Sequence, residues 1–332
     1  MKILVTGNLG YIGSHLTDLL VNAGHEVIGC DLSLFPEAVC GELVEPSEQL
    51  ICDFRDLTAS KLTKIDAIAH LAGISNDPMG ELNPGLTLSI NGRGTVDFAK
   101  SAQSAGVKVF TFASSCSLYG SSSNLPRVEL DETNPLSEYA TSKLVAENGL
   151  AELKSSNFNV YLLRNATAYG ASSVFRSDLV VNDLSSGMHA NGAAEIRSDG
   201  SPWRPLIHCR DMARAFQIFL ESNPVQISGK PINIGFTSEN FQVKDIGVEV
   251  QRIWPKGQIS YVPNAVSDPR DYKVNFSLFE STFPQFLPKY QLRKGIMDLG
   301  QYLQKIEYSR NDRISKRYVR LQELQKRISE LI

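Results

Sequence analysis

A tyrosine and a lysine near the middle of the chain have a spacing that suits proton transfer. Tyr139 and Lys143 are four residues apart in the segment S-E-Y-A-T-S-K, which is rich in helix formers. On a helix, this spacing puts both side chains on one face, one turn apart. An ammonium group beside a phenol favours the phenolate. Tyr139 could therefore act as an acid/base nearer to neutral pH than its ordinary pKa of about 10 suggests.

Three serines precede this pair and could contribute a hydroxyl to the same chemistry. Ser114, Ser115 and Ser117 lie in F-A-S-S-C-S-L-Y-G, directly after an apolar run that we expect to be a strand. In open α/β sheets, ligands bind along the carboxyl ends of the strands. A serine hydroxyl at that edge can hydrogen-bond the substrate oxygen that Tyr139 protonates or deprotonates.

A glycine fingerprint near the N-terminus predicts a dinucleotide site. Gly7, Gly10 and Gly13 follow the apolar run Ile3 to Val5, and helically spaced apolar residues come next. At such a strand-to-helix turn, missing side chains let the backbone approach a pyrophosphate. Asp31 ends a second apolar run about 20 residues later, where a carboxylate can bind a ribose hydroxyl. That carboxylate would repel a 2′-phosphate, which favours NAD over NADP.

The elements that must position these residues alternate between strands and helices. Apolar runs occur at 3–5, 27–29, 50–52, 67–71, 107–113 and 160–163, with helical stretches near 91–105 and 139–154. This alternation predicts an α/β fold with a doubly wound parallel sheet, because parallel strands need crossovers. We expect a dinucleotide-binding domain at 1–165, with return segments near 204–236. Residues 166–332 would form mainly a smaller substrate-binding lobe.

The end of the chain is expected to form an amphipathic helix from about 312 to 331. Its apolar positions recur at steps of three and four: Ile314, Tyr318, Leu321, Leu324, Ile328 and Leu331. Basic residues occupy its other faces: Lys316, Arg317, Arg320, Lys326 and Arg327. We favour a helix that packs on its own protein and presents a solvated outer face. A contact between subunits is the alternative.

Composition excludes several classes of function. The chain has 332 residues, a formal net charge of −3 and a pI near 6.0, which gives no electrostatic case for nucleic acid. It has neither a signal-peptide pattern nor an apolar stretch long enough to span a bilayer, so we expect a cytoplasmic protein without membrane contact. The five cysteines lack metal-ligand spacing, so no metal site is expected.

The motifs together resemble a known family. The chain resembles extended short-chain dehydrogenase/reductases of the NAD-dependent sugar-nucleotide epimerase/dehydratase family. The matching segments are T-G-N-L-G-Y-I-G, C-D-F-R-D, H-L-A-G, N-G-R-G-T, A-S-S-C-S-L-Y-G, Y-A-T-S-K and R-P-L-I-H-C-R-D. They spread over most of the first 235 residues, in an order and spacing that are highly specific.

The resemblance implies a role for each matching residue. Tyr139 would be the acid/base, Lys143 its ribose-binding partner and Ser115 the catalytic hydroxyl. Residues that would hold the cofactor pyrophosphate are Gly7, Gly10, Tyr11, Ile12 and Gly13. Residues that would bind or flank the rest of NAD are Asp31, Asp53, Phe54, Leu71, Ala72 and Gly73. Asn91 would lie near the nicotinamide and the sugar.

The resemblance also implies a substrate that carries a diphosphate. Arg204 matches a family arginine that contacts the diphosphate of a sugar nucleotide, and Arg270 resembles a second such position. The guanidinium donors suit phosphate oxygens. Thr167, which we also place at the substrate, stands where the family usually has asparagine. Asn165 could compensate for that change.

Departures from the family pattern narrow the chemistry. Cys116 and Ser117 stand where 4,6-dehydratases of the family place acidic residues, so a 4,6-dehydratase is disfavoured. We expect NAD-dependent chemistry at C4 of a nucleotide-diphosphate sugar, with 4-epimerisation as the leading hypothesis. A 4-keto sugar-nucleotide reductase or 4-dehydrogenase is the alternative, and a non-catalytic dinucleotide-binding scaffold is a third. By resemblance, we expect a homodimer formed through the helices near 91–105 and 139–154.

Overall fold

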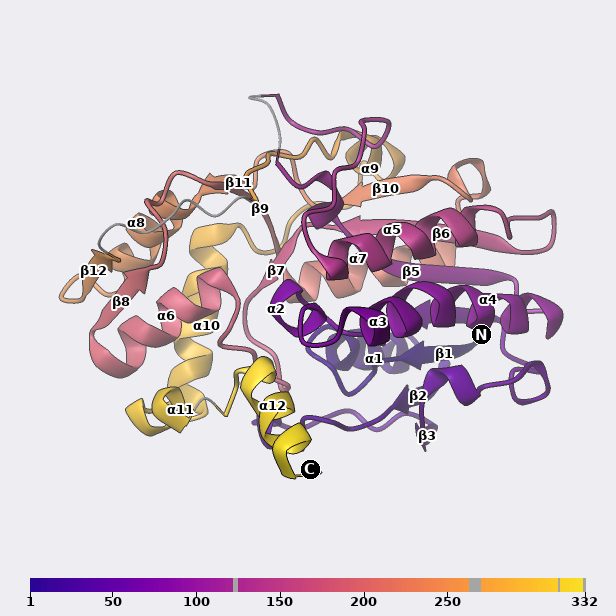
Figure 1. Cartoon of the computed structure of the whole chain (residues 1–332), viewed down its shortest axis with the longest axis horizontal. Coiled ribbons are helices and arrows are strands. Elements are labelled where there is room, and N and C mark those ends of the chain that lie inside the picture. The colour runs from indigo at the N-terminus through magenta and orange to yellow at the C-terminus, as the bar shows by residue number, and fades with distance from the viewer. Residues whose placement is uncertain (122–124, 263–269, 316, 331–332) are drawn as a thin grey trace.

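A seven-stranded parallel sheet forms the larger part of the molecule (Figure 1). The computed structural model describes residues 1–121, 125–262, 270–315 and 317–330. The strand order is β10-β6-β5-β4-β1-β2-β3. The strands are β1 (Lys2–Thr6), β2 (Glu26–Asp31), β3 (Glu48–Ile51), β4 (Ala67–His70), β5 (Val109–Ser115), β6 (Asn159–Asn165) and β10 (Pro231–Ile234). The predicted doubly wound α/β fold is confirmed.

Helices cover both faces of this sheet because successive strand residues point to opposite sides. Ile3 and Val5 of β1 belong to one apolar cluster, which includes residues of α1 (Gly13–Asn22) and α7 (Cys209–Ser222). Leu4 belongs to the other cluster, with residues of α4 (Thr95–Ser104) and α5 (Glu138–Ala151). Two buried cores therefore hold the sheet between its helices.

A smaller lobe is built from short strands and three longer helices. Its strands are β7 (Thr167–Tyr169), β8 (Ala193–Ile196), β9 (Trp203–His208), β11 (Asn240–Gln242) and β12 (Gln258–Tyr261). They form a three-stranded sheet, β11-β9-β7, and a two-stranded sheet, β12-β8. Helices α6 (Val180–Asn191), α8 (Val243–Ile253) and α10 (Leu292–Lys305) pack beside them, to the left in Figure 1.

The remaining helical elements are short. They are η1 (Pro36–Ala38), η2 (Phe54–Asp56), η3 (Ala59–Lys61), α2 (Asp77–Gly80), α3 (Pro84–Thr87), η4 (Leu88–Gly94), η5 (Cys116–Tyr119), η6 (Val225–Ile227), α9 (Ser277–Thr282), α11 (Arg310–Ser315) and α12 (Arg320–Glu330). The helix expected near 91–105 is thus a π-helical turn, η4, followed by α4. The segment expected to return to the large sheet near residue 204 is instead β9 of the small sheet, and the return runs through α7 and β10.

The prediction of a single helix at 312–331 is wrong, because α11 ends at Ser315 and a separate helix, α12, begins at Arg320. Tyr318 is buried at the break, with its ring centroid 5.5 Å from that of Phe175 and 5.6 Å from that of Tyr308. This packing outweighs helical continuity. Ile314, expected on the apolar face, is 66% exposed, whereas Arg320, expected on a solvated face, is buried. Lys316, Leu331 and the side chain of Ile328 lie outside the described residues.

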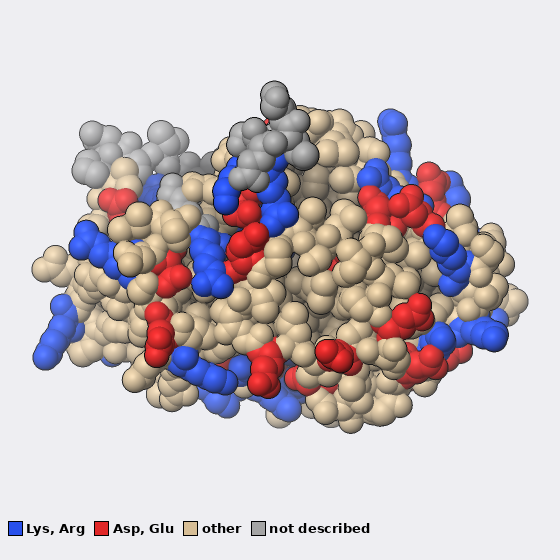
Figure 2. Space-filling view, turned by 90° about the horizontal axis from the view of Figure 1, so that it is seen from below, with Lys and Arg blue, Asp and Glu red and all other residues tan. Residues whose placement is uncertain are grey.

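The surface of the described chain carries interspersed charges. Figure 2 shows Lys and Arg mixed with Asp and Glu over one face, without a continuous field of one sign. None of the helices in the described ranges combines the length and apolar composition that crossing a bilayer requires. Among the same residues, no group of three or more His, Cys, Asp or Glu side chains is arranged to hold a metal ion.

Candidate active site

A cavity of about 1090 Å³ runs from the glycine turn, along the carboxyl ends of the sheet strands, into the small lobe. Every residue that the sequence suggested for the site lines this cavity, with the exception of Asn91. The lining residues are Gly7, Gly10, Tyr11, Ile12, Gly13, Asp31, Asp53, Phe54, Leu71, Ala72, Gly73, Ser115, Tyr139, Lys143, Thr167, Arg204 and Arg270. The fold therefore brings together the predicted catalytic residues, the predicted cofactor-binding residues and the residues assigned to the substrate.

The turn after β1 requires glycine at two positions. Gly7 has a φ of +76°, and a Cβ there would lie 2.8 Å from the backbone nitrogen of Ala72. A Cβ on Gly13, the first residue of α1, would lie 2.0 Å from the carbonyl oxygen of Gly7. The tight turn leaves its backbone and the N-terminus of α1 facing the cavity, as an anion site requires.

Two carboxylates line the far end of the same cavity. Asp31 ends β2, and its Oδ1 accepts a hydrogen bond of 2.8 Å from the backbone N–H of Ser33. Burial raises the pKa of Asp31. Asp53 pairs with Arg55 at 2.6 Å, and the hydrogen bonds from Arg55 lower the pKa of the Asp53 carboxyl. Phe54 is buried beside these residues, with its ring centroid 4.6 Å from that of His70.

Tyr139 and Lys143 occupy the first turns of α5, facing the end of β5. Ser137 caps this helix, because its side chain accepts a hydrogen bond from the Ala140 N–H. The Lys143 ammonium is buried, donates to the Ala113 carbonyl at 2.7 Å and lies 5.7 Å from the Tyr139 ring centroid. Ser115, the last residue of β5, accepts a hydrogen bond of 3.1 Å from the Ser117 N–H, and it lies close enough to Tyr139 to lower the pKa of the phenol.

Burial dominates the electrostatics of this pair. It raises the pKa of the Tyr139 phenol to about 12; the Asp77 carboxylate adds to the rise, and Ser115 and Arg176 oppose it. Burial also lowers the pKa of the Lys143 ammonium to about 7, against the raising effect of Glu147. The protein alone therefore leaves Tyr139 protonated at neutral pH, so further positive charge is needed to favour the phenolate.

A buried ion pair supports the lysine from below. Glu147, one turn after Lys143 on α5, pairs with Arg164 of β6 at 2.8 Å, with side-chain exposures of only 4% and 6%. The Ser114 hydroxyl donates to the same carboxylate at 2.5 Å. The network fixes α5 against β5 and β6, and so fixes the position of Lys143.

The small-lobe end of the cavity contains the two arginines assigned to the substrate. Arg204 is buried, and its Nη1 donates to the carbonyls of Trp203 and Arg270. The Arg270 guanidinium pairs with Asp77 of α2 at 2.5 Å, which joins the small lobe to the rim above Tyr139. Thr167, the first residue of β7, also lines the cavity.

Asn91 lies outside the cavity wall and contacts the loop behind it. Its Oδ1 accepts from the Ile74 N–H and its Nδ2 donates to the Ile74 carbonyl, both at 2.9 Å. A Cβ on Gly73 would lie 2.6 Å from this Oδ1. Asn91 therefore holds the Gly73–Ile74 backbone in place, and its predicted proximity to the nicotinamide and the sugar stays a prediction.

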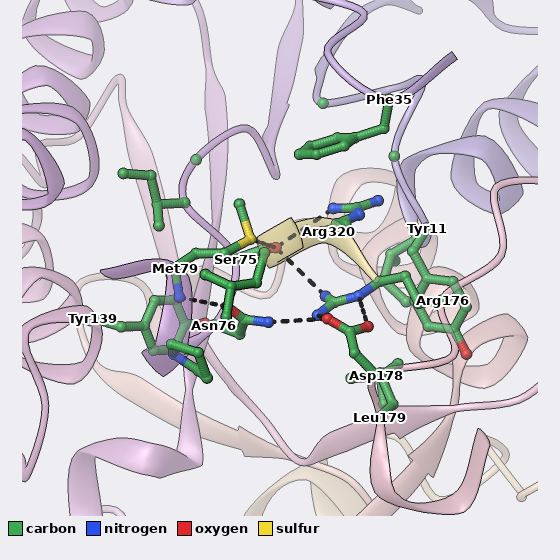
Figure 3. A pocket seen from close by; sticks show the side chains of 18 of the residues that line it. Tyr11, Phe35, Ser75, Asn76, Met79, Tyr139, Arg176, Asp178, Leu179 and Arg320 are labelled. Carbon is green, nitrogen blue, oxygen red and sulfur yellow. Dashed lines mark hydrogen bonds and ion pairs between the residues drawn. The ribbon is translucent and has the colours of Figure 1, made fainter. Parts of the chain in front are cut away.

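Sequence reasoning missed a polar group that the small lobe and the C-terminal segment send into the cavity (Figure 3). Arg176 forms two hydrogen bonds with Asp178, each 2.9 Å long. Both Arg176 and Arg320 reach the Ser75 hydroxyl, at 3.4 Å. No motif surrounds Arg176 or Asp178 in the sequence, and the amphipathic pattern predicts a solvated position for Arg320, which is in fact buried.

Comparisons with known proteins agree with the fold and with the motifs. The model of the NAD-dependent epimerase/dehydratase family matches residues 3–235. UDP-glucuronic acid decarboxylase 1 of Arabidopsis thaliana is 26% identical over 305 residues, covering 89% of this chain and 68% of that relative.

Solved structures also resemble the chain. UDP-glucuronic acid 4-epimerase from Bacillus cereus, in complex with UDP-glucuronic acid and NAD, has a TM-score of 0.78 at 25% identity, covering 92% of this chain and 100% of that structure. An NAD-dependent NDP-hexosamine 5,6-dehydratase of tunicamycin biosynthesis has a TM-score of 0.80 at 22% identity, covering 92% and 98%, and shares the fold.

Proposed function

The chain belongs to the NAD-dependent epimerase/dehydratase family, and we propose that it catalyses the 4-epimerisation of a nucleotide-diphosphate sugar. Membership of the family and the similarity to these relatives indicate an NAD-dependent enzyme that modifies sugar nucleotides. One observation supports the proposal of 4-epimerisation. Ser115, Tyr139 and Lys143 share a cavity with the glycine turn and with two arginines suited to a diphosphate.

The residues of this cavity fit NAD. The turn at Gly7 and Gly13 excludes any Cβ and leaves backbone N–H groups and the α1 N-terminus for a pyrophosphate. At the end of β2, Asp31 presents a carboxylate to the cavity, which suits ribose hydroxyls and opposes a 2′-phosphate. Asp53 and Phe54 would lie at the adenine, whereas Leu71, Ala72 and Gly73 would flank the cofactor.

Tyr139 is the proposed base for the sugar. Its Oη would take the proton of the C4 hydroxyl, and Ser115 would hold the same oxygen by a hydrogen bond. NAD, when bound, supplies the acceptor and later the donor of the C4 hydride. After the 4-keto sugar turns in the site, Tyr139 returns its proton to the oxygen at C4, now in the opposite configuration.

The electrostatics require the cofactor for this proton transfer. The pKa of Tyr139 is about 12 in the protein alone, because of burial and the Asp77 carboxylate. The positive charge of oxidised nicotinamide, together with the Lys143 ammonium, would lower that pKa. Deprotonation of Tyr139 is thereby tied to the bound, oxidised cofactor, so the base becomes active when a hydride acceptor is present.

The residues after Ser115 do not favour dehydration. Cys116 is buried, with its thiol directed to the Arg164 carbonyl at 3.1 Å, and burial raises the pKa of the thiol. Ser117 has a hydroxyl at the position where a dehydratase would have a carboxylate. Neither residue suits the abstraction of a C5 proton or the expulsion of water. Oxidation at C4 without elimination fits these residues better.

Decarboxylation is the second candidate, because several relatives are UDP-glucuronic acid decarboxylases. It shares the C4 oxidation: a 4-keto sugar with a carboxylate on C5 is a β-keto acid, which loses CO₂ and is then reduced at C4. Net reduction or oxidation at C4 would use the same side chains as well. The product separates these reactions.

The proposal is tested with the purified enzyme and UDP-glucuronic acid, followed by UDP-, GDP-, CDP- and dTDP-hexoses, with and without added NAD. The products are identified by NMR, and absorbance at 340 nm is followed. We expect a C4 epimer from one nucleotide sugar with no net change in NADH. A UDP-pentose with released CO₂ would replace epimerisation by decarboxylation, and stoichiometric NADH formation or consumption would replace it by net redox chemistry.

We also propose that the enzyme is a homodimer, joined through the face formed by η4, α4 and α5. Val145 on α5 is 38% exposed and Leu86 on the neighbouring α3 is 45% exposed, which suits an apolar contact. Multi-angle light scattering at micromolar concentration should give twice the chain mass, and Val145→Glu should lower it. A monomer of the unmodified chain would refute this proposal.

A further inference from the structure

The C-terminal segment forms part of the wall of the cofactor cavity. Val319, Arg320, Leu321, Gln322 and Leu324 line that cavity. Tyr318 is buried just before them, and its carbonyl accepts a hydrogen bond of 3.0 Å from the Ser177 N–H. The segment therefore packs against Ser177 and against cavity residues from much earlier in the chain.

Further contacts hold α12 against the connection between β2 and β3. Arg327 pairs with Glu37 at 2.9 Å, and Arg317 donates to the backbone carbonyl of Glu37 at 2.5 Å. That connection follows Asp31, where we place the adenosine ribose. The helix thus packs on its own protein, and it does so across the edge of the cofactor site.

Arg320 reaches from this segment into the cavity, where Phe35, Ser75 and Arg176 lie around it (Figure 3). The residue is 9% exposed, and its guanidinium carbon lies 5.0 Å from the Phe35 ring centroid. Nη1 donates to the Ser75 hydroxyl at 3.4 Å, whereas Nε and Nη2 have no hydrogen-bond partner among the described residues. A Cβ placed on Gly10 would lie 3.9 Å from Nη2.

Two carboxylates, Asp178 and Asp31, lie near Arg320, but neither forms a hydrogen bond with its guanidinium among the described residues. Arg176 reaches the same hydroxyl, but its guanidinium is already matched by two hydrogen bonds to Asp178. Burial, and then the positive charge of Arg176, lower the pKa of Arg320 to about 9, against the raising effects of Asp178, Asp31 and Tyr11. Arg320 therefore stays protonated at neutral pH. A buried cation with unmatched donors is costly, and an anion beside it would remove much of that cost.

We propose that Arg320 binds the pyrophosphate of NAD, so that the C-terminal segment closes the cofactor site over the glycine turn. Gly10 belongs to the turn that approaches the pyrophosphate, and the free Nε and Nη2 donors lie on the same side as a bidentate phosphate contact requires. The Phe35 ring lies 5.0 Å from the guanidinium carbon, close enough for a cation–π contact that helps to position the side chain. The inference rests on NAD binding at this turn and is independent of the reaction at C4.

This arrangement separates Arg320 from Arg204 and Arg270. The latter two lie at the small-lobe end of the cavity, where Arg270 pairs with Asp77 near Tyr139. Arg320 lies with Phe35 and Gly10, at the end where the cofactor enters its turn. Loss of Arg320 should therefore weaken the cofactor and leave the sugar-nucleotide end of the site intact.

The test compares Arg320→Ala with Arg252→Ala, which removes the same charge from an exposed pair on α8, away from the cofactor cavity. Each protein is stripped of NAD, and the Kd values for NAD, ADP and adenosine are measured by calorimetry without a sugar nucleotide. We expect Arg320→Ala to raise the Kd for NAD and ADP by about 10- to 100-fold, because a charge-assisted contact to phosphate is lost. Adenosine should bind Arg320→Ala as tightly as it binds the unmodified protein, because it lacks phosphate, and Arg252→Ala should bind all three ligands with unchanged affinity.

Arg320→Lys and Arg320→Gln distinguish the loss of a phosphate contact from misfolding of the segment. Both keep a long side chain in the segment, and the lysine variant, which keeps the charge, should recover part of the affinity for ADP that the glutamine variant loses. Unchanged Kd values for NAD and ADP in Arg320→Ala would overturn the proposal. An equal loss of adenosine affinity would also overturn it, because Arg320 would then act on the shape of the site and not on the pyrophosphate.

Discussion

Replacement of Glu147 by glutamine tests whether the buried ion pair both holds the fold and sets the charge of the catalytic lysine. The Glu147 carboxylate accepts three hydrogen bonds from Arg164, of 2.8 to 3.1 Å, and one from Ser114. It also raises the pKa of Lys143, which burial has lowered to about 7. Glu147→Gln removes the negative charge and leaves the side chain nearly the same size.

The expected loss of stability is large. Breaking a buried ion pair by removing one partner costs about 3–5 kcal/mol, because the other charge stays buried and uncompensated. For 332 residues, an unfolding entropy of about 2.1 cal/mol/K per residue gives roughly 0.7 kcal/mol/K for the chain. The Tm should therefore fall by about 4–7 °C. Loss of Glu147 should also lower the pKa of Lys143 further, so the ammonium is lost at lower pH and the alkaline limb of kcat/KM moves to lower pH.

Circular dichroism melts and pH profiles of kcat/KM measure the two effects. Ser114→Ala is the matched control, because it removes one hydrogen bond to Glu147, costs about 1 kcal/mol and leaves the ion pair intact. The double change Glu147→Leu with Arg164→Met should recover most of the lost stability, since no lone buried charge remains. A Tm fall no larger than that of Ser114→Ala, or an alkaline limb that does not move, would refute the reasoning.

Three further changes test other parts of the account. Tyr139→Phe should lower kcat by about 10²-fold or more while the Kd for NAD, measured by equilibrium dialysis, stays within about twofold; activity near that of the unmodified enzyme would exclude Tyr139 as the base. Asp77→Asn removes a carboxylate that raises the pKa of Tyr139, so the acidic limb of the kcat/KM profile should move to lower pH, and a limb that moves to higher pH would contradict this. Gly13→Ala should raise the Kd for NAD by about 10-fold or more, because its Cβ would lie 2.0 Å from the Gly7 carbonyl oxygen, whereas Gly85→Ala, where the nearest atom is 3.7 Å away, should bind NAD normally.

Much of the sheet and of the cofactor end could be predicted from local patterns. Ile3 to Val5 and Val107 to Ala113 form short apolar runs between helical segments, and such alternation has few solutions other than a parallel sheet with helices on both faces. Gly7 and Gly13 carry a backbone requirement, and their spacing in the sequence already indicates it. Tyr139 and Lys143 belong to one helix, so their four-residue spacing alone predicts that their side chains lie on the same face.

The parts that could not be predicted depend on contacts between distant segments. Arg320 and Arg327 both fall on the basic side of the amphipathic pattern, and nothing in that pattern shows that Arg320 is buried. Tyr318, two residues earlier, packs on Phe175, and this contact brings the segment against the cavity. The burial of Tyr318 also breaks the predicted helix. Arg176 has no periodic pattern around it, and its role in the cavity follows from the return of the chain after β7. Periodicity describes a helix face but does not say which part of the protein covers it.

The central claim is that one enzyme removes the C4 hydride and returns it to the opposite face of the same sugar. It is tested most directly with the nucleotide sugar that the enzyme accepts, labelled with deuterium at C4. NMR of the product should show the C4 epimer with deuterium still on C4 and no net NADH at 340 nm. Loss of the deuterium to free NADH, or a product changed at C5 or C6 while C4 keeps its configuration, would contradict the proposed 4-epimerisation.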